Sequence, residues 1–309
     1  MLSLTRKFQG TNYRRTITGI NYVIFTYGPG GAATTQKYSI PDQITVTGST
    51  FPQLPGNQSP GVHAGAATST STFGFFVGGG RTPTDPTYRY AYSGDIITTS
   101  APLGVATALG RVCAAGNAEV CSVHQGSSSA TLATIRRFVY ADEAVGNGTF
   151  LSRAVLDSSA TGNKELSIFR NRGGTGGVDT DRFEFAPDTR TTGPALSNAG
   201  ATGVSSTGNG TIGIIVGGFI NFGVPGYSTN KLNFAANTCV LGTRLVNTST
   251  SVGSMCGTTS TGVFASGSGA VAGVPGHTYE YASDVTALTA PDFGARGNGA
   301  CANPVGVNV

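Results

Sequence analysis

The chain has 309 residues, of which 11% are charged, compared with roughly 25% in an average soluble domain. It contains 47 glycines and no tryptophan, and 39% of its residues are hydrophobic. This combination excludes a disordered chain, which needs low hydrophobicity and high net charge, and favours a packed protein rich in strands and loops. No apolar run approaches the roughly 20 residues of a membrane helix, so we expect no membrane insertion.

The net charge of +4 comes from the first 19 residues, where Arg6, Lys7, Arg14 and Arg15 have no acidic neighbour. Without these four residues the chain has 15 basic and 15 acidic residues, because 19 − 4 = 15. A neutral body argues against nucleic-acid binding, which requires clustered Lys and Arg. The first residues, MLSLTRKFQGTNYRR, lack the apolar core of a secretory signal. We therefore expect a protein that either stays in the cytosol where it is made or leaves by assembly or lysis rather than by the general export route.

Residues 1–19 are interpreted as a basic N-terminal arm with two alternative roles. One is structural, as a loose tail or an additional edge strand. The other is partner binding, in which Arg6, Lys7, Arg14 and Arg15 steer the arm to an acidic groove of a neighbouring subunit. The segment RRTITGI from Arg14 then adds to that subunit as a strand.

From residue 20 to 309 one short sequence motif, called the phrase below, occurs six times, with an aromatic or apolar residue near its start. The six positions are Tyr38, Tyr90, Phe138, Phe183, Leu232 and Tyr279. Their gaps of 52, 48, 45, 49 and 47 residues define six units of about 48 residues. In RFEFAPDT from Arg182 and its counterparts, large apolar residues alternate with others, which indicates a half-buried strand.

Each phrase ends at an acidic or amide residue that we expect to close a hairpin turn. These residues are Asp42, Asp95, Asp142, Asp188, Asn237 and Asp284. Their side chains bond nearby backbone and tolerate left-handed conformations, so the local turn is favoured over a ring of ligands.

Each unit is predicted to contain three further strands. An apolar run ending in glycine, such as FGFFVGGG from Phe73 or IGIIVGG from Ile212, is typical of a strand covered on both faces. A strand of small residues lies upstream of the apolar run, as in RVCAAGN from Arg111 and SMCGTTS from Ser254. Small side chains are required where the innermost strands of several sheets converge around one centre. A polar segment such as DTRTTG from Asp188 follows the phrase and is expected at a solvated outer edge.

These units predict an all-β fold, a β-propeller of six four-stranded antiparallel blades. A linear solenoid is the alternative, but it requires polar capping repeats that are not evident. The first unit lacks an inner strand, whereas the C-terminus has a spare one, GNGACANPVG from Gly297. We therefore predict that this strand pairs beside residues 21–28 and closes the ring, which hides two sheet edges.

FGFFVGGG followed by YRYAYSGD, and IGIIVGG followed by NKLNFAANT, resemble kelch-type propeller repeats, although the usual tryptophan is absent. The closer similarity is to the degenerate repeats found in structural proteins of tailed bacteriophages. This resemblance implies a virion component in a tail, a fibre or a capsid decoration, and it carries over no catalytic residue.

Residues with catalytic chemistry are sparse. His63, His124 and His277 form no metal-binding spacing, and no Gly-x-Ser-x-Gly elbow occurs. The glycine-rich loops lack the following lysine and the helix of a phosphate site. Paired carboxylates from separate blades are the one enzymatic arrangement left open. We therefore expect no enzyme activity, no metal and no cofactor.

The five cysteines allow several interpretations. Cys113, Cys256 and Cys301 lie in small-residue segments, where free cysteine acts as a compact apolar residue. Reduced thiols are expected in the cytosol, and a bond between Cys113 and Cys121 across a hairpin is the alternative. Cys239, in an outer strand, is the candidate for a contact between subunits.

The leading hypothesis is a non-enzymatic virion protein that acts as an assembly or adhesion module. Its partners would be other virion proteins or copies of itself, with a host-surface glycan as a further partner. A stand-alone carbohydrate-binding lectin or adhesin is the alternative, and a secreted hydrolase is the third hypothesis, which would require an axial pocket lined by acids.

Overall fold

The computed structural model describes the strands and most turns of the chain. The described residues are 22–27, 34–39, 44–50, 66–70, 72–77, 87–92, 96–100, 102, 113–124, 133–155, 158–171, 177–197, 204–217, 219–221, 224–225, 228–245, 252–266, 276–288 and 297–302. His63, Asp42, Asp95 and the arm residues Arg6, Lys7, Arg14 and Arg15 lie outside them.

The described chain is all-β and consists of antiparallel four-stranded sheets, together with one short hairpin, β18 (Phe219–Asn221) and β19 (Val224–Pro225). Five sheets are built from strands that follow one another along the chain. The second sheet contains β4 (Ala66–Ser69), β5 (Phe73–Val77), β6 (Thr87–Ala91) and β7 (Ile96–Ser100). The third sheet contains β8 (Cys113–Gly116), β9 (Val120–His124), β10 (Ile135–Val139) and β11 (Val145–Asn147).

The next three sheets repeat the same order along the chain. The fourth contains β12 (Ala160–Gly162), β13 (Leu166–Arg170), β14 (Thr180–Glu184) and β15 (Thr189–Thr192). The fifth contains β16 (Val204–Gly208), β17 (Ile212–Gly217), β20 (Thr229–Asn233) and β21 (Thr238–Gly242). The sixth contains β22 (Val252–Gly257), β23 (Thr261–Ser266), β24 (His277–Glu280) and β25 (Val285–Leu288).

The first sheet is different because it combines the two ends of the described chain. It contains β26 (Gly297–Ala302), β1 (Tyr22–Tyr27), β2 (Thr34–Ser39) and β3 (Ile44–Thr50) in that order. β26 pairs antiparallel with β1, with Ala302 opposite Ile24 and Cys301 opposite Phe25. The C-terminal strand thus occupies the inner position that the first unit does not supply from its own sequence.

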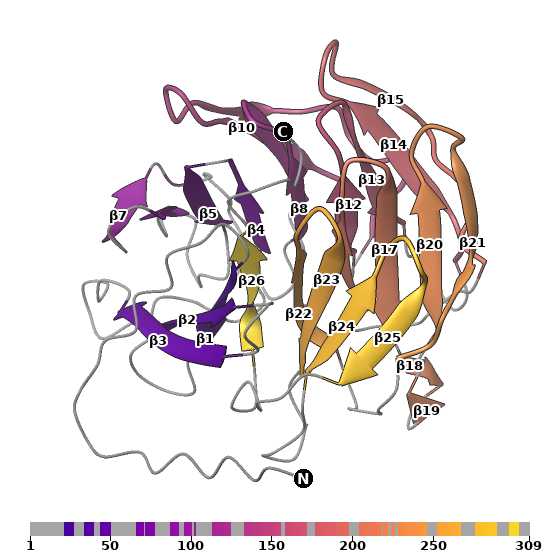
Figure 1. The fold of residues 1–309 in the computed structure, drawn as a ribbon. Helices are drawn as coiled ribbons and strands as arrows, with labels where there is room; N and C mark the ends of the chain where they lie inside the picture. Colours follow the sequence, from indigo (N-terminus) through magenta and orange to yellow (C-terminus); the bar gives the residue numbers. More distant parts are fainter. Residues whose placement is uncertain are drawn as a thin grey trace, which may run out of the picture.

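The sheets have a β-propeller arrangement, with one strand of each near a common centre (Figure 1). The innermost strands contact one another in the order β26, β4, β8, β12, β16 and β22, and β22 also contacts β26. Strands β3, β7, β11, β15, β21 and β25 are the outer strands of their sheets. This order places the small-residue strands innermost, followed by the apolar and aromatic strands, as predicted.

The hydrophobic core lies between neighbouring sheets rather than within one of them. Phe75 of the second sheet packs with Phe138 and Tyr140 of the third, and its ring stacks on Tyr140 at a centroid distance of 4.6 Å. The fourth sheet contributes Ile168 to a cluster with Leu232 of the fifth. Every residue of β9 and β13 is buried, as expected for apolar strands covered on both faces.

The turn predicted after each third strand is confirmed for three described units. Asp188, Asn237 and Asp284 have φ values of 61°, 52° and 56°, in the left-handed region that amide and acidic residues tolerate. In the third unit the left-handed residue is Glu143, with φ 56°, one position after the predicted Asp142. Asp142 still supports the turn, since its carboxylate accepts a hydrogen bond from the Ala144 backbone.

Crowding near the axis is visible at Gly208, the last residue of β16. A Cβ atom there would lie 2.7 Å from Oγ1 of Thr161 in the neighbouring sheet and 2.8 Å from the Ile212 carbonyl oxygen. Both distances are far below van der Waals contact, and the carbonyl cannot move without disturbing the strand pair. The small residues of the inner strands are therefore a steric requirement.

We expect Gly208→Ala to lower the free energy of unfolding by about 2 kcal/mol, because overpacking a tight site typically costs 1–3 kcal/mol. Gly210→Ala is the matched control, since a Cβ there would meet nothing within 4 Å. Urea unfolding of both variants provides the measurement. Equal stability of the two variants would contradict the steric explanation.

Candidate functional site

The two ends of the sheets carry connections of very different length. Three residues join the first and second strands, at 117–119, 163–165, 209–211 and 258–260. At the opposite end, the second and third strands are separated by 125–134, 171–179, 218–228 and 267–276. We call these ends the short-turn face and the long-loop face. Binding residues are more often placed on long loops than on tight turns, so the long-loop face is the first place to expect a site.

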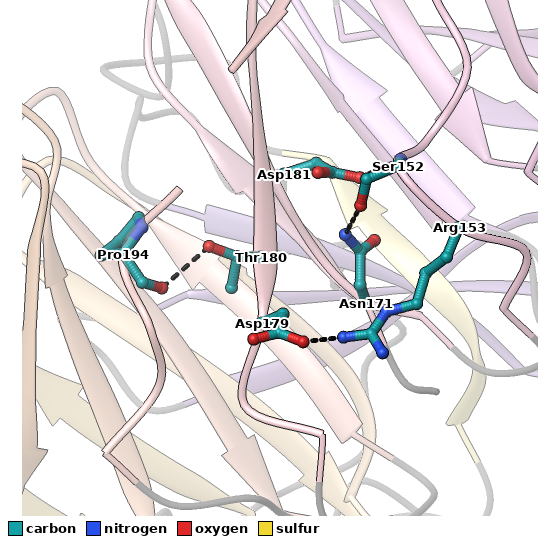
Figure 2. A network of polar contacts seen from close by, with 7 residues as sticks. All are labelled: Ser152, Arg153, Asn171, Asp179, Thr180, Asp181 and Pro194. Atoms are coloured by element: carbon teal, nitrogen blue, oxygen red, sulfur yellow. Dashed lines mark hydrogen bonds and ion pairs between the residues drawn. The ribbon is translucent and has the colours of Figure 1, made fainter. Parts of the chain in front are cut away.

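A polar network on the long-loop face joins the third and fourth sheets (Figure 2). The carboxylate of Asp181, which is buried, accepts a hydrogen bond of 2.7 Å from the Ser152 backbone N–H. Ser152 Oγ accepts a bond of 3.1 Å from the side-chain amide of Asn171. Arg153 forms an ion pair with Asp179, and the Thr180 hydroxyl donates to the Pro194 carbonyl at 2.8 Å. The network fixes the connection after β11 against β13 and β14.

This network has the chemistry of a structural clamp. Each of its two carboxylates already has a donor, from a backbone N–H in one case and a guanidinium in the other. Asn171 is fully buried, and its Oδ1 has no hydrogen-bond partner among the described residues. Within the described residues, no group of three or more His, Cys, Asp or Glu is placed to hold a metal ion.

In the second to fifth sheets, the basic residue that opens the repeated phrase connects its sheet to the next one. It lies on the third strand, and its side chain reaches the turn after the third strand of the following sheet. The four contacts are Arg89 to Glu143 at 3.7 Å, Arg137 to Asp188 at 4.0 Å, Arg182 to the Phe234 carbonyl at 3.0 Å, and Lys231 to the Tyr281 carbonyl at 2.9 Å. The contacts of Arg182 and Lys231 are short hydrogen bonds from a charged donor, which are stronger than neutral ones. The ion pairs of Arg89 and Arg137 are longer and partly exposed, so we expect them to stabilise their interfaces less.

A second repeated contact lies on the short-turn face and uses asparagine. Each asparagine accepts bonds through Oδ1 from the backbone of its own turn and donates through Nδ2 to the middle carbonyl of the next turn. The three donations are Asn117 to Lys164 at 3.0 Å, Asn163 to Gly210 at 3.1 Å, and Asn209 to Thr259 at 2.8 Å. The side chain therefore closes one turn and ties it to the neighbouring sheet.

These asparagines were not predicted from the sequence. Their signal is a Gly-Asn pair at the end of the inner strand, at 116–117, 162–163 and 208–209. A local interpretation sees only a turn there, because the acceptor carbonyl lies 47 or 50 residues further along the chain. That separation is close to the length of one unit, which is the feature that marks a contact between repeats.

The second sheet has Thr70 where the next three sheets have asparagine, and a substitution there is predicted to increase stability. Thr70 Oγ1 accepts bonds from Thr72 and Phe73, so it closes the turn but has no amide to donate across the interface. We expect Thr70→Asn to place a donor near the Ala118 carbonyl and to raise the free energy of unfolding by about 1 kcal/mol. Thr70→Asp serves as the control, because it keeps the acceptor without the donor. Equal stability of the two variants would contradict the prediction.

The tyrosines of the sixth sheet link it to the fifth. Burial raises the pKa of the Tyr281 phenol, whose hydroxyl lies 3.1 Å from Thr207 Oγ1. Burial likewise raises the pKa of Tyr279, and its hydrogen bond to Asp284 acts in the same direction. The Asp284 carboxylate also accepts a bond of 3.0 Å from the Thr243 backbone. Both phenols are therefore neutral structural donors.

The described histidines and cysteines lie mainly in the core. His124 and His277 are buried, and burial lowers the pKa of His277, which keeps it neutral. Cys113 and Cys121 form no disulfide, so the alternative of a bond between them was wrong. Their register explains this result, because Cys113 lies opposite His124 and Cys121 lies opposite Gly116. Burial raises the pKa of the Cys121 thiol to about 12, which makes it unreactive. The expectation that Cys256 is a free cysteine was also wrong, because it is disulfide-bonded.

The outer strands are less uniformly polar than predicted. β15 is exposed along its whole length and is polar, as expected. In contrast, Val240 and Leu241 of β21 are 57% and 60% exposed, and Val285 of β25 is 52% exposed. Leu288 of β25 is exposed as well. We call these four residues the apolar rim.

The apolar rim extends over two sheets that are in direct contact. Thr286 of β25 donates a hydrogen bond of 2.9 Å to the Arg244 carbonyl, just beyond the end of β21. Cys239, the predicted subunit contact, lies in β21 and is a free, half-buried cysteine, with its sulfur 3.8 Å from Ser197 Oγ. Exposed apolar side chains on the outer strands of sheets mark surfaces suited to protein contact.

The fold and these contacts define an antiparallel β-propeller held together by ties between neighbouring sheets. Comparison with models of known protein families gives no match, and comparison with curated protein sequences gives none either. In the described part of the chain, no helix has the length and apolar character needed to cross a membrane.

Proposed function

We propose that this chain is a non-enzymatic structural protein of a tailed-phage virion, where it acts as an assembly or adhesion module in a tail, a fibre or a capsid decoration. Two features support the proposal. The kelch-like repeats resemble those of phage structural proteins, and the described polar networks are used to hold sheets together. Its partners are other virion proteins or further copies of this chain, and its place of action is the particle.

The module in this proposal is a ring of six blades that is closed by its C-terminal strand. Six four-stranded sheets, the pairing of β26 with β1, and the contacts of β26 with both β22 and β4 support this architecture. A closed ring leaves the outer strand as the free edge of each blade, so partners meet the protein either at that rim or on the long-loop face.

The observation that carries the assembly role is the apolar rim. Val240, Leu241, Val285 and Leu288 expose apolar surface on two neighbouring outer strands, and Ile96 and Phe150 are the other exposed large hydrophobic residues of the described chain. Soluble proteins limit such clusters unless a partner covers them. The aromatic side chains of the third strands, in contrast, are in the core, where Tyr90, Phe138 and Tyr279 are fully buried. They offer no stacking surface for a sugar, which favours assembly over the lectin alternative.

A particle-incorporation experiment tests this function. Particles purified from the native source should contain the chain, and Leu241→Lys with Val285→Lys should reduce its incorporation at least tenfold, because charged side chains block edge contacts. Thr191→Lys on the polar strand β15 is the control and should leave incorporation unchanged. Particles that lack the chain would overturn the proposal, and glycan-array binding by the isolated protein would replace it with the lectin alternative.

The role of the arm is tested separately. A chain without residues 1–15 should fold but incorporate poorly if Arg6, Lys7, Arg14 and Arg15 bind a neighbouring subunit. Unchanged incorporation would favour the structural alternative for the arm.

A further inference from the structure

The sixth sheet lacks both of the ties that connect earlier sheets to their successors. Thr278 stands where the second to fifth sheets have Arg or Lys, and it has no charge to reach the next turn. Thr258 stands where the third to fifth sheets have asparagine, and its Oγ1 accepts bonds from Ser260 and Thr261 of its own turn. Of the five sheets formed by β4 to β25, this is the one in which both residues are replaced.

A covalent bond is present at this same sheet. Cys256, near the end of β22, is disulfide-bonded, whereas Cys113, Cys121 and Cys239 are free. The chain has five cysteines, so Cys301 is the remaining partner within it. The backbone supports this pairing, because Cys301 lies in β26 and β26 contacts β22 near the centre of the propeller (Figure 1).

We propose that a disulfide between Cys256 and Cys301 locks the closing strand β26 to the inner strand of the sixth sheet, in place of the ties that Thr258 and Thr278 do not provide. The bond closes a loop of 45 residues, because 301 − 256 = 45. It holds β26 at the position from which β26 pairs with β1. This inference is independent of the virion assignment, since it concerns how the ring stays closed in any setting.

The chemistry of the lock is ordinary thiol–disulfide exchange. One cysteine thiolate attacks a small-molecule disulfide and releases one small thiolate, and the second cysteine thiolate attacks the resulting mixed disulfide and releases the other, so that the small disulfide takes up the two electrons given up by the cysteines. The protons of the two protein thiols are transferred to solvent and to the leaving thiolates. We therefore expect the bond to form when the protein meets an oxidising environment, and to be absent in a reducing cytosol.

Peptide mapping tests the connectivity. Trypsin separates the relevant cysteines into peptides 232–244, 245–296 and 297–309, and both Cys113 and Cys121 fall in 112–136. After equilibration of the full chain with oxidised glutathione, non-reducing mass spectrometry should find 245–296 linked to 297–309. Free thiols on both peptides, or a link from 245–296 to any other peptide, would overturn the proposal.

Thermal unfolding tests the role of the bond. Cys256→Ser, Cys301→Ser and the double variant should each lower the Tm of the oxidised protein by roughly 5–10 °C, to the value of the reduced wild type. Cys239→Ser is the control, because Cys239 is a free cysteine on an outer strand, and it should leave the Tm unchanged. Equal Tm values for the oxidised wild type and the variants would show that the linkage is not a lock, and would overturn that part of the proposal.

Discussion

A chain that ends at residue 296 is expected to lose cooperative unfolding and to aggregate. The truncation removes β26, which supplies the inner strand of the first sheet and contacts the inner strands of the second and sixth sheets. β1 would then expose the backbone N–H and C=O groups that β26 satisfies. An unpaired strand edge of this kind is a template for association with another chain. The effect should exceed that of any point substitution, because a whole row of backbone hydrogen bonds is lost at once.

Light scattering and calorimetry provide the measurement, with two controls that separate the causes. A chain that ends at residue 302 retains β26 and should unfold cooperatively. Cys301→Ser retains β26 but not the thiol. Any stability that the chain ending at residue 296 loses beyond the loss in Cys301→Ser is therefore due to missing strand pairing. A soluble chain ending at 296, with a single sharp transition close to that of the full chain, would contradict the idea that β26 completes the propeller.

The third strand of each unit could be predicted from sequence because its signals are local. Alternation places Phe183 in the core and Arg182 at the surface, and the acidic residue that follows fits a left-handed turn at Asp188. The inner strand β12 was missed, since its three residues, ATG, are too short and too small to form a pattern. Its burial comes from the third and fifth sheets as well as from its own sheet.

The ties between sheets were beyond local interpretation for a different reason. Arg182 was recognised as part of the repeated phrase, but its acceptor, the Phe234 carbonyl, lies 52 residues away. Thr161 donates in the same way to the Thr207 carbonyl, 46 residues along the chain. These separations match the unit length, so the phrase repeats because each copy must fit the next copy as well as fold by itself.

The apolar rim was mispredicted because the polar outer strands of the second and fourth units were taken to represent all six. β21 reads TCVLG and β25 reads VTAL, so each strand has two adjacent apolar residues and no strict alternation that would mark one face as buried. Sequence alone does not tell whether such a strand faces a neighbouring sheet or solvent. The structure decides this point, since nothing among the described residues covers Val240 or Leu241.

Asn163→Ala is expected to lower the free energy of unfolding by about 3 kcal/mol, more than the other point substitutions proposed above. Asn163 is buried, and its Oδ1 accepts bonds of 2.9 Å from Glu165 and 3.1 Å from Leu166. Its Nδ2 donates to the Gly210 carbonyl of the next sheet. Alanine removes all three bonds and leaves the buried Leu166 N–H and two partly buried backbone groups without this partner, at a cost of about 1 kcal/mol each.

Asn163→Asp distinguishes the two halves of this contact. The carboxylate still accepts from Glu165 and Leu166 but has no N–H for Gly210, so about a third of the destabilisation should remain. Asn233→Ala is the control, because Asn233 is exposed and makes one bond, to the Ala236 backbone, so it should cost at most about 1 kcal/mol. Urea unfolding measures all three variants. If Asn163→Asp were as stable as the wild type, the hydrogen bond from Asn163 to the Gly210 carbonyl would contribute nothing to stability, and the fourth and fifth sheets would have to be held together by their other contacts, such as the bond from Thr161 to the Thr207 carbonyl.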